Sequence, residues 1–231
     1  MQVFHCKDTS ASDGSTVSAD ALNTICAHIR AGKVICLPTD TVYGIGADPF
    51  NPDAVTALLE AKSRTRQMPP PVLVADLTQA QALIDPCARA GVIAQIAKQL
   101  IHRFWPGALT IILPVNPQIG WDLGETHSTV ALRMPDHAVA RRILGATGPL
   151  AVTSANKTGQ PPAHNVSQAQ EQLAEAVSIY IDAGEAPGGV PSTILRLHTD
   201  HPREVDVVRC GAIDPGFIEQ EIGGIKLTPV K

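Results

Sequence analysis

The chain has 231 residues, of which 44% are hydrophobic, 17% charged and 3% aromatic. This profile excludes an intrinsically disordered protein and predicts a compact core filled by aliphatic side chains. A formal net charge of -4 shows no basic excess, which disfavours extensive binding to a nucleic-acid backbone. The five cysteines are odd in number and form no CxxC pair, so neither a disulfide framework nor a zinc knuckle is expected.

The N-terminal residues lack the basic flank and the apolar run of a secretory signal. No apolar stretch approaches the ~20 residues that a membrane-spanning helix needs. We therefore expect a cytoplasmic protein without a membrane partner.

Short aliphatic runs alternate with helical patterns along the chain. The spacing of apolar residues predicts helices near 21–29, 52–62, 78–84, 89–103, 137–144 and 167–176. Runs typical of strands lie at 34–37, 72–75, 108–113, 130–134, 150–153, 178–181, 192–195 and 205–208. This alternation predicts one α/β domain with a twisted mixed sheet and flanking helices. We expect the domain to span residues 1–213, followed by a tail, residues 214–231, that packs on it or trails from it.

A turn rich in small polar residues follows the first buried strand, in the segment LPTDTVYGIGAD at residues 37–48. Loops at strand ends are where α/β sheets place ligand groups, and threonine hydroxyls can hold the polar groups of an amino acid. Gly44 and Gly46 would let the backbone approach a ligand closely, but they form no dinucleotide fingerprint because the third glycine is missing. A purely structural turn is the alternative for this segment.

Three cations, Lys62, Arg64 and Arg66, end the second predicted helix just before the rigid run Pro69-Pro70-Pro71. Such a group could clamp a polyphosphate, because a guanidinium pairs with phosphate through two parallel hydrogen bonds. The alternative is that these cations only balance the dipole of the helix C-terminus.

Two further segments carry polar residues at predicted strand ends. In VTSANKTG, residues 152–159, Ser154 and Asn156 offer neutral donors for phosphate or ribose oxygens. Ser192 and Arg209 each stand in a β-rich run, and an ordinary turn or a surface ion pair would explain any one of these residues alone. The sequence has no HExxH, GxSxG or GxxxxGK[ST] motif, so we expect no metal site built by the protein.

Together these segments resemble the YrdC/Sua5/TsaC family of threonylcarbamoyl-AMP synthases, in the short form without the extra C-terminal domain of Sua5. The resemblance runs from about residue 22 to residue 213. Its blocks keep the order of the family: LPTDTVYGIGAD, AKSR, RFWPGALTIIL, STVALRMPDH, VTSANKTG, PSTIL and VVRCGAI. Chance does not explain so many blocks in register.

The resemblance implies an open concave cavity, mostly positively lined, on a twisted α/β sheet. It implies that Thr41 contacts threonine, that Arg133 binds the threonine carboxylate, and that Lys62 and Arg64 are catalytic. It also places Ser154, Asn156 and Arg209 on the ATP side of the cavity. Thr129 and Ser192 would contribute hydroxyls to the pocket.

The activity that the resemblance implies is that of a nucleotidyltransferase. Such an enzyme forms threonylcarbamoyl-AMP and pyrophosphate from L-threonine, bicarbonate or CO2, and ATP, and the product is the precursor of the threonylcarbamoyladenosine modification of tRNA. Mg2+ would accompany ATP, held mainly by phosphates and water. The expected partners are these substrates and a downstream threonylcarbamoyl transferase complex, with tRNA bound only weakly or indirectly.

Two departures from the family pattern leave alternatives open. Thr65, Met68 and residues 69–71 replace the proline, polar residue and Pro-Leu that commonly follow KxR, and residues 157–158 and 162–163 also differ after SxN. A YciO-type paralogue would bind nucleotide or RNA without efficient synthesis. An RNA- or ribosome-binding protein would need a concentrated basic face. A lyase resembling dihydroxybutanone-phosphate synthase would need acidic metal-binding clusters, which the sequence lacks.

Overall fold

The computed structural model describes residues 2–6 and 17–230, and the described strands form one mixed sheet. The strands are β1 (Gln2–His5), β2 (Ile35–Leu37), β3 (Gly44–Ala47), β4 (Val72–Leu73), β5 (Leu109–Pro114), β6 (Thr129–Arg133), β7 (Leu150–Ser154), β8 (Ile179–Asp182), β9 (Thr193–Leu197), β10 (Glu204–Arg209) and β11 (Lys226–Pro229). Their order across the sheet is β1-β8-β2-β3-β7-β4-β6-β5-β9-β10-β11.

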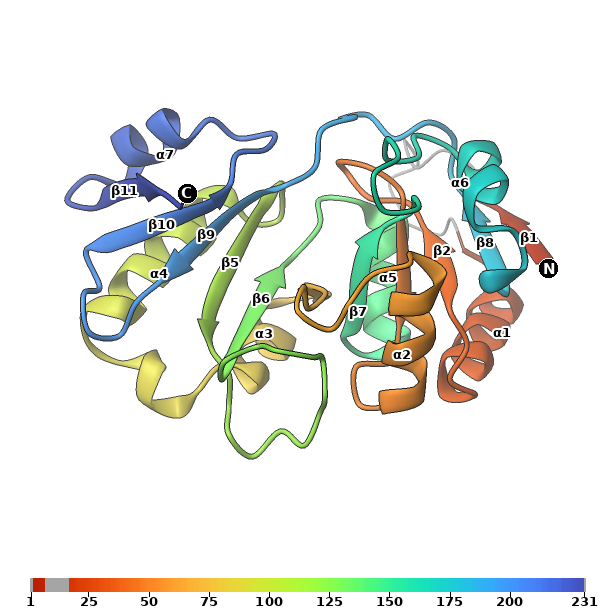
Figure 1. Cartoon of the computed structure of the whole chain (residues 1–231), viewed down its shortest axis with the longest axis horizontal. Coiled ribbons are helices and arrows are strands. Elements are labelled where there is room, and N and C mark those ends of the chain that lie inside the picture. Colours follow the sequence, from red (N-terminus) through yellow and green to blue (C-terminus); the bar gives the residue numbers. More distant parts are fainter. Residues whose placement is uncertain (1, 7–16, 231) are drawn as a thin grey trace.

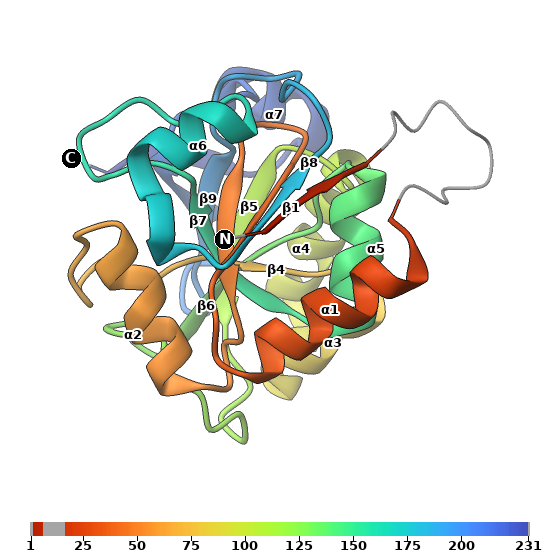
Figure 2. The ribbon, with the colours of Figure 1, turned by 90° about the vertical axis from the view of Figure 1, so that its right-hand side faces the viewer.

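The helices cover this sheet and bury two aliphatic clusters. They are α1 (Ala19–Arg30), α2 (Pro52–Ala61), α3 (Leu77–Leu83), α4 (Gly91–Phe104), α5 (Ala138–Thr147), α6 (Val166–Leu173) and α7 (Pro215–Ile222). The smaller cluster lies between the helix pair α1 and α5 and the strands β2, β7 and β8, and the larger cluster fills the rest of the molecule. Seen from the end of the sheet, α2 and α6 lie on one side and α1 and α5 on the other (Figure 2).

The helices begin where the sequence supplies a capping side chain. Asn51 accepts hydrogen bonds from the backbone N–H groups of Asp53 and Ala54, and Pro52 occupies the first turn, where its missing N–H costs nothing. Ser18, Asp76, Asn165 and Asp214 cap α1, α3, α6 and α7 in the same way. The second helix therefore has a fixed start and ends at Ala61, immediately before the first cation of the site.

The structure confirms the predicted α/β class, and each predicted helix and strand is present within a few residues. Sequence reasoning did not find β1, β3, β11 and α7. The strand β3 has the sequence GIGA, and glycine disfavours a strand on propensity alone. Packing explains the glycines: a methyl group on Gly44 would lie 2.7 Å from Val152 Cγ1 on the neighbouring β7. Interpreting residues 44–47 as part of a turn was therefore wrong.

The C-terminal segment joins the body of the sheet. Strand β11 pairs in parallel with β10, and α7 packs on α4 through an edge-to-face contact between Phe217 and Phe104 with ring centroids 6.2 Å apart. Arg103 donates a 2.6 Å hydrogen bond to Glu221 across the same contact. Strand β11 thus extends the sheet at one edge, and α7 packs on α4.

None of the helices in residues 2–6 and 17–230 combines the length and apolarity needed to cross a bilayer. The prediction about a secretory signal concerns the first residues, of which 1 and 7–16 lie outside the described part of the chain.

The sheet has two halves, joined through the two-residue strand β4. Figure 1 shows β1, β8, β2, β3 and β7 in one half and β6, β5, β9, β10 and β11 in the other. Strand β4 pairs with β7 on one side and with β6 on the other. The segment 183–192 runs from β8 to β9 and so links the two halves a second time (Figure 1). A cavity lined by both halves lies between them.

Candidate active site

The cavity has a volume of about 700 Å³, within the usual size of a small-molecule site. Its walls come from the turn after β2, the loop after α2, the strands β5, β6, β7, β9 and β10, and the loop before β6. Segments that are distant in the sequence therefore meet around one space.

Lys62 lies in one wall, one layer behind the cavity surface. It is the C-cap of α2, and the next residue, Ser63, takes a left-handed conformation with φ 53°, so the chain leaves the helix there. The Lys62 Nζ donates to the backbone oxygen of Ser154 at 2.6 Å, to Ser154 Oγ at 3.1 Å and to Asn156 Oδ1 at 3.0 Å. Burial lowers the pKa of Lys62 to about 8, and repulsion from Arg64 acts in the same direction. Lys62 thus bonds across to β7 rather than to the end of its own helix.

Arg64 follows on the same turn and reaches the cavity itself. Its Nη1 donates to Thr153 Oγ1 at 3.0 Å, while its Nε is buried and has no hydrogen-bond partner in the described chain. A buried donor without a partner costs free energy unless a ligand satisfies it. Burial also lowers the pKa of Arg64. This guanidinium is therefore held ready for an acceptor that the protein does not provide.

Arg133 ends β6 and, like Lys62, is buried. Its Nε donates to Gly107 O at 2.9 Å, its Nη1 to Thr41 Oγ1 at 2.9 Å and its Nη2 to Asp40 Oδ1 at 2.6 Å. Burial lowers the pKa of Arg133, whereas the charge and hydrogen bond of Asp40 raise it. The turn after β2 therefore fixes the plane of the guanidinium and leaves two of its five N–H groups free to bond a ligand.

Arg209 approaches from the opposite half of the sheet. The β9–β10 pairing shifts its register between Val207 and Arg209, and such a bulge redirects the side chains that follow it. The Arg209 Nε and Nη2 donate to Ser192 O at 3.0 and 2.8 Å, and Nη2 also donates to Ser192 Oγ at 3.0 Å. Ser192 Oγ is 2.8 Å from Thr110 Oγ1, so a chain of hydroxyls supports this cation.

The three guanidiniums share one electrostatic environment. Burial lowers the pKa of Arg209, and the positive charges of Arg133 and Arg64 lower it further. Asp40 offsets one of these charges through its contact with Arg133, and Glu125 is the carboxylate among the residues that line the cavity. This excess of positive charge around the cavity predicts an anionic ligand.

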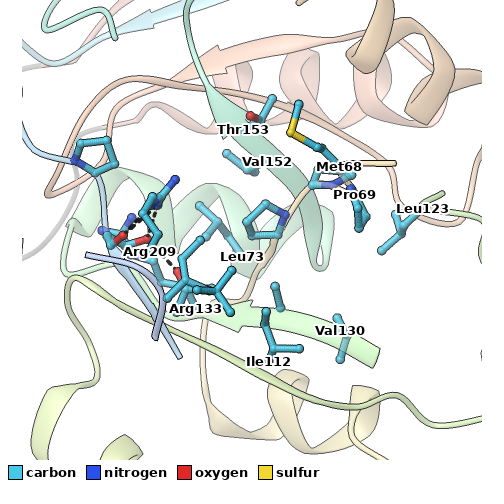
Figure 3. Close-up of a pocket in the computed structure, with 18 of the residues that line it drawn as sticks. Met68, Pro69, Leu73, Ile112, Leu123, Val130, Arg133, Val152, Thr153 and Arg209 are labelled. Atoms are coloured by element: carbon cyan, nitrogen blue, oxygen red, sulfur yellow. Dashed lines mark hydrogen bonds between the residues drawn. The ribbon is translucent and has the colours of Figure 1, made fainter. Parts of the chain in front are cut away.

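The cavity also has an apolar end. Figure 3 shows Arg133 and Arg209 on one side of the pocket, and Met68, Pro69, Leu123 and Val130 on the other. The Met68 side chain is exposed, whereas Leu123 is buried. The site can therefore hold a ligand that is strongly anionic at one end and apolar at the other.

The sequence profile of the Sua5/YciO/YrdC family, described as Telomere recombination, matches residues 27–211. The chain belongs to this family.

Several members of the family are close enough in sequence to compare along most of the chain. The chain is 41% identical over 222 residues to a putative threonylcarbamoyl-AMP synthase of Mycobacterium leprae, which covers 96% of this chain and 94% of that protein. It is 38% identical over 201 residues to the threonylcarbamoyl-AMP synthase of Bacillus subtilis, covering 86% of this chain but only 56% of that protein.

Solved structures of the family share the fold. The structure of P. abyssi Sua5 complexed with L-threonine superposes with a TM-score of 0.85 at 29% identity, covering 99% of this chain and 63% of that one. The chain thus spans less than two thirds of that Sua5. E. coli YciO superposes with a TM-score of 0.75 over 96% of this chain and 98% of that one, at 22% identity, and shares the fold alone.

The structure brings the residues predicted for a family site into one region. Those that line the cavity are Thr41, Arg64, Thr129, Arg133, Ser154, Ser192 and Arg209. Lys62 and Asn156 do not line it; they lie behind Ser154 and hold it. The Thr129 hydroxyl donates to Thr126 O at 2.6 Å, so its lone pairs remain available to a ligand.

Sequence reasoning missed part of the lining. The missed polar residues are Thr39, Tyr43, Gln67, Thr110, Glu125, Thr126, His127, Thr153, Arg196 and His198. Thr110 and Thr153 stand inside family blocks, where their strand positions gave the available signal. Glu125, Thr126 and His127 lie in a loop without periodicity, and nothing in the sequence marks them. In the described residues, no group of three or more His, Cys, Asp or Glu side chains gathers as a metal site.

Proposed function

We propose that the chain is an L-threonylcarbamoyladenylate synthase, which forms threonylcarbamoyl-AMP and pyrophosphate from L-threonine, bicarbonate or CO2, and ATP. One observation carries the proposal: Arg64, Arg133 and Arg209 come from distant parts of the sequence and converge on one cavity with an unneutralised positive charge. Relatives of known name support it, because those that are 34–41% identical to the chain are named threonylcarbamoyl-AMP synthases.

The triphosphate would lie against Arg64 and Arg209. The unpaired Nε of Arg64 and the remaining N–H groups of Arg209 would bond phosphate oxygens, with the charge-assisted hydrogen bonds that guanidinium makes to phosphate. Since Thr153 holds Arg64 and Ser192 holds Arg209, these groups need little reorganisation when charge develops.

The amino acid would lie beside Arg133 and Thr41. Two N–H groups of Arg133 remain after its bonds to Gly107, Thr41 and Asp40 within the described residues. They would bind the threonine carboxylate, and the Thr41 hydroxyl would contact the same ligand. The structure of P. abyssi Sua5 complexed with L-threonine shares this fold and supports an amino-acid site in it.

The reaction would need no covalent enzyme intermediate. The neutral threonine amine attacks the carbon of CO2 and its nitrogen loses a proton to water, or it attacks bicarbonate and the amine proton leaves with hydroxide as water; either route gives N-carboxythreonine. The carbamate oxygen then attacks the α-phosphorus of ATP, the bond to the β-phosphate oxygen breaks, and pyrophosphate leaves with the electron pair. Side chains that hold both substrates in line lower the barrier by proximity and by charge neutralisation.

Lys62 would act through Ser154 in this reaction. All three N–H groups of the ammonium are engaged, by two oxygens of Ser154 and by Asn156. Its charge strengthens the positive field, and its bonds fix the end of β7 next to the triphosphate. Lys62 would therefore be a positioning residue, whereas Arg64 would contact the substrate directly.

Mg2+ would enter on ATP, and the donor set fits an ion that phosphates and water coordinate. Glu125 is the carboxylate lining the cavity, and a Mg2+ site of this kind needs only one or two carboxylates besides phosphate oxygens. When bound, the ion would neutralise charge on the phosphates.

The adenine would lie at the apolar end, against Met68, Pro69, Leu123 and Val130 (Figure 3). A base with an apolar face packs well against such side chains, whereas the triphosphate would have no counter-charge there. The enclosed part of the cavity would also keep water from the carbamate and the anhydride, both of which hydrolyse.

The test is incubation of the protein with ATP, Mg2+, bicarbonate and L-threonine, with pyrophosphate assayed and the adenylate detected by mass. We expect pyrophosphate release that requires both threonine and bicarbonate, and a product mass that shifts when the threonine is isotopically labelled. Nucleotide binding without threonine-dependent pyrophosphate release would overturn the proposal and favour the YciO-type alternative. In the proposed function, the adenylate that the enzyme releases would serve a downstream threonylcarbamoyl transferase that modifies tRNA.

A further inference from the structure

The segment 184–191, GEAPGGVP, crosses from one half of the sheet to the other and lies against the turn that carries Asp40 and Thr41. We call it the strap. Its bonds to the rest of the molecule are mostly made by backbone atoms, so the sequence pattern alone does not reveal its contacts. The strap enters the cavity wall at Pro191, next to Ser192.

Hydrogen bonds tie the strap down along its length. The Tyr43 hydroxyl donates to Gly184 O at 2.7 Å, and the Ala186 N–H donates to His164 O at 2.7 Å. The Gly189 N–H donates to Thr41 O at 2.8 Å. At the far end, the Ala212 N–H donates to Pro191 O at 2.9 Å, which joins the strap to the turn after Arg209.

Gly188 makes the closest approach of the strap to the site. A methyl group at Gly188 would lie 2.8 Å from Asp40 O, 3.1 Å from Thr41 Cα and 3.2 Å from Thr41 O. These neighbours are backbone atoms, which cannot rotate away as the end of a flexible side chain can. Any side chain at position 188 must therefore push the turn or the strap aside.

The turn that Gly188 touches holds Arg133. Asp40 Oδ1 and Thr41 Oγ1 accept the two hydrogen bonds from the Arg133 Nη atoms, at 2.6 and 2.9 Å. A shift of the Asp40–Thr41 backbone by a few tenths of an ångström moves both acceptors, and the buried guanidinium must follow them. No comparable path leads from Gly188 to Arg64, which is held from α2 and β7.

We propose that Gly188 is a positioning residue: the strap presses on the Asp40–Thr41 backbone and so sets the place of the Arg133 guanidinium at the amino-acid end of the cavity. The inference deepens the proposed function and rests on it for the identity of the ligand. It assigns the Gly188 contact of the strap to the threonine side of the site, whereas the other end of the strap, at Pro191, borders the triphosphate side.

The experiment is Gly188→Ala, compared with Gly145→Ala, since a methyl group at Gly145 would meet no atom within 4 Å. In Gly188→Ala we expect the KM for threonine to rise about tenfold, because small misplacements of binding groups are costly. The KM for ATP should stay within about twofold of wild type, because Arg64 and Arg209 keep their partners. Gly145→Ala should change neither constant. Equal rises in both constants, or no rise, would overturn the proposal.

A structural measurement separates this inference from the proposed function. The amide of Gly189 should lose hydrogen-exchange protection in Gly188→Ala and keep it in Gly145→Ala, because its acceptor is Thr41 O. If wild type shows no threonine-dependent turnover, the proposed function fails, and exchange at Gly189 still decides whether the strap holds the turn. Unchanged protection there would show that it does not.

A second variant covers the case in which Gly188→Ala does not fold. Tyr43→Phe removes the hydroxyl that donates to Gly184 O and accepts from the Ala183 N–H at 3.1 Å. It should loosen the start of the strap and raise the threonine KM above that for ATP, by a smaller factor than Gly188→Ala. A variant that folds and leaves the ratio of the two constants unchanged would sink the proposal.

Discussion

The two ends of the cavity are built by opposite means. At the cationic end, each guanidinium is fixed by protein oxygens: Arg64 by Thr153, Arg133 by Asp40 and Thr41, and Arg209 by Ser192. At the apolar end, Met68 and Pro69 offer surface without donors, and the loop carrying Leu123 closes it (Figure 3). Buried charges need partners in fixed geometry, whereas apolar contact tolerates adjustment. Substitutions at the cationic end should therefore cost far more than those at the apolar end.

The largest effect should follow from Asp40→Ala. The pair that Asp40 forms with Arg133 is buried on both sides, with side-chain exposures of 13% and 7%. Removing one partner of a buried pair leaves an uncompensated charge, and we expect a loss of about 3–5 kcal/mol in the free energy of unfolding. Urea denaturation at neutral pH measures it.

The matched control is Asp122→Asn. Asp122 pairs with Arg66 on the surface, where both side chains are about half exposed. An exposed pair contributes about 0–1 kcal/mol, so this variant should unfold close to wild type. Equal losses in the two variants would show that burial does not distinguish the pairs.

The next effect should be on catalysis. Arg64→Ala removes the guanidinium whose Nε has no protein partner, and we expect kcat/KM for threonine-dependent pyrophosphate release to fall about 10²–10³-fold, the usual cost of losing one donor to developing charge. Arg66→Ala removes an exposed cation two residues away and should leave the rate nearly unchanged. If both variants lose activity alike, net charge rather than the position of Arg64 governs binding.

The pH dependence of stability should reveal Lys62. Its pKa is lowered to about 8 in the folded protein, so between about pH 8 and the ordinary value near 10.4 the unfolded chain binds more protons. Stability contributed by Lys62 therefore rises with pH across this window, by at most about 1.4 kcal/mol per pH unit, and its burial cost is fully present below pH 8.

The measurement is the difference between wild type and Lys62→Met in urea, taken at several values from pH 7.5 to 10. The difference cancels the contribution of the titratable groups that both proteins share. We expect the free energy of unfolding of the wild type to rise relative to that of Lys62→Met as the pH rises. If the difference between the two free energies of unfolding does not change with pH, burial of the charged Lys62 ammonium does not destabilise the protein.

The sequence predicted the elements whose pattern is local and missed those that depend on partners. Aliphatic spacing and capping residues such as Asn51 located the helices. Strand β3 escaped because its glycines suit a contact with Val152, which lies more than 100 residues away. The helix α7 escaped because its apolar residues show no clear periodicity, and Ile218 is the residue that it buries.

The site shows the same division between local signal and tertiary contact. Family blocks located Arg64, Arg133 and Arg209, yet nothing local shows that Asp40 binds Arg133 or that Lys62 lies behind Ser154. The role of Gly188 depends on a backbone contact with Thr41, which no pattern of side chains encodes. The residue types at the site were readable, whereas the distances between them were not.

The smallest effect should come from Met68→Ser at the apolar end. Met68 is 47% exposed and its side chain is apolar, so the change removes apolar contact without stranding a buried polar group. If adenine packs there, the KM for ATP should rise about threefold, with the threonine KM and the unfolding midpoint unchanged. Val92→Ser, another exposed apolar residue far from this cavity, should leave both constants alone. Because Arg64 and Arg209 still hold the triphosphate, a loss as large as that of Arg64→Ala would show that the apolar wall, and not the cations, dominates nucleotide binding.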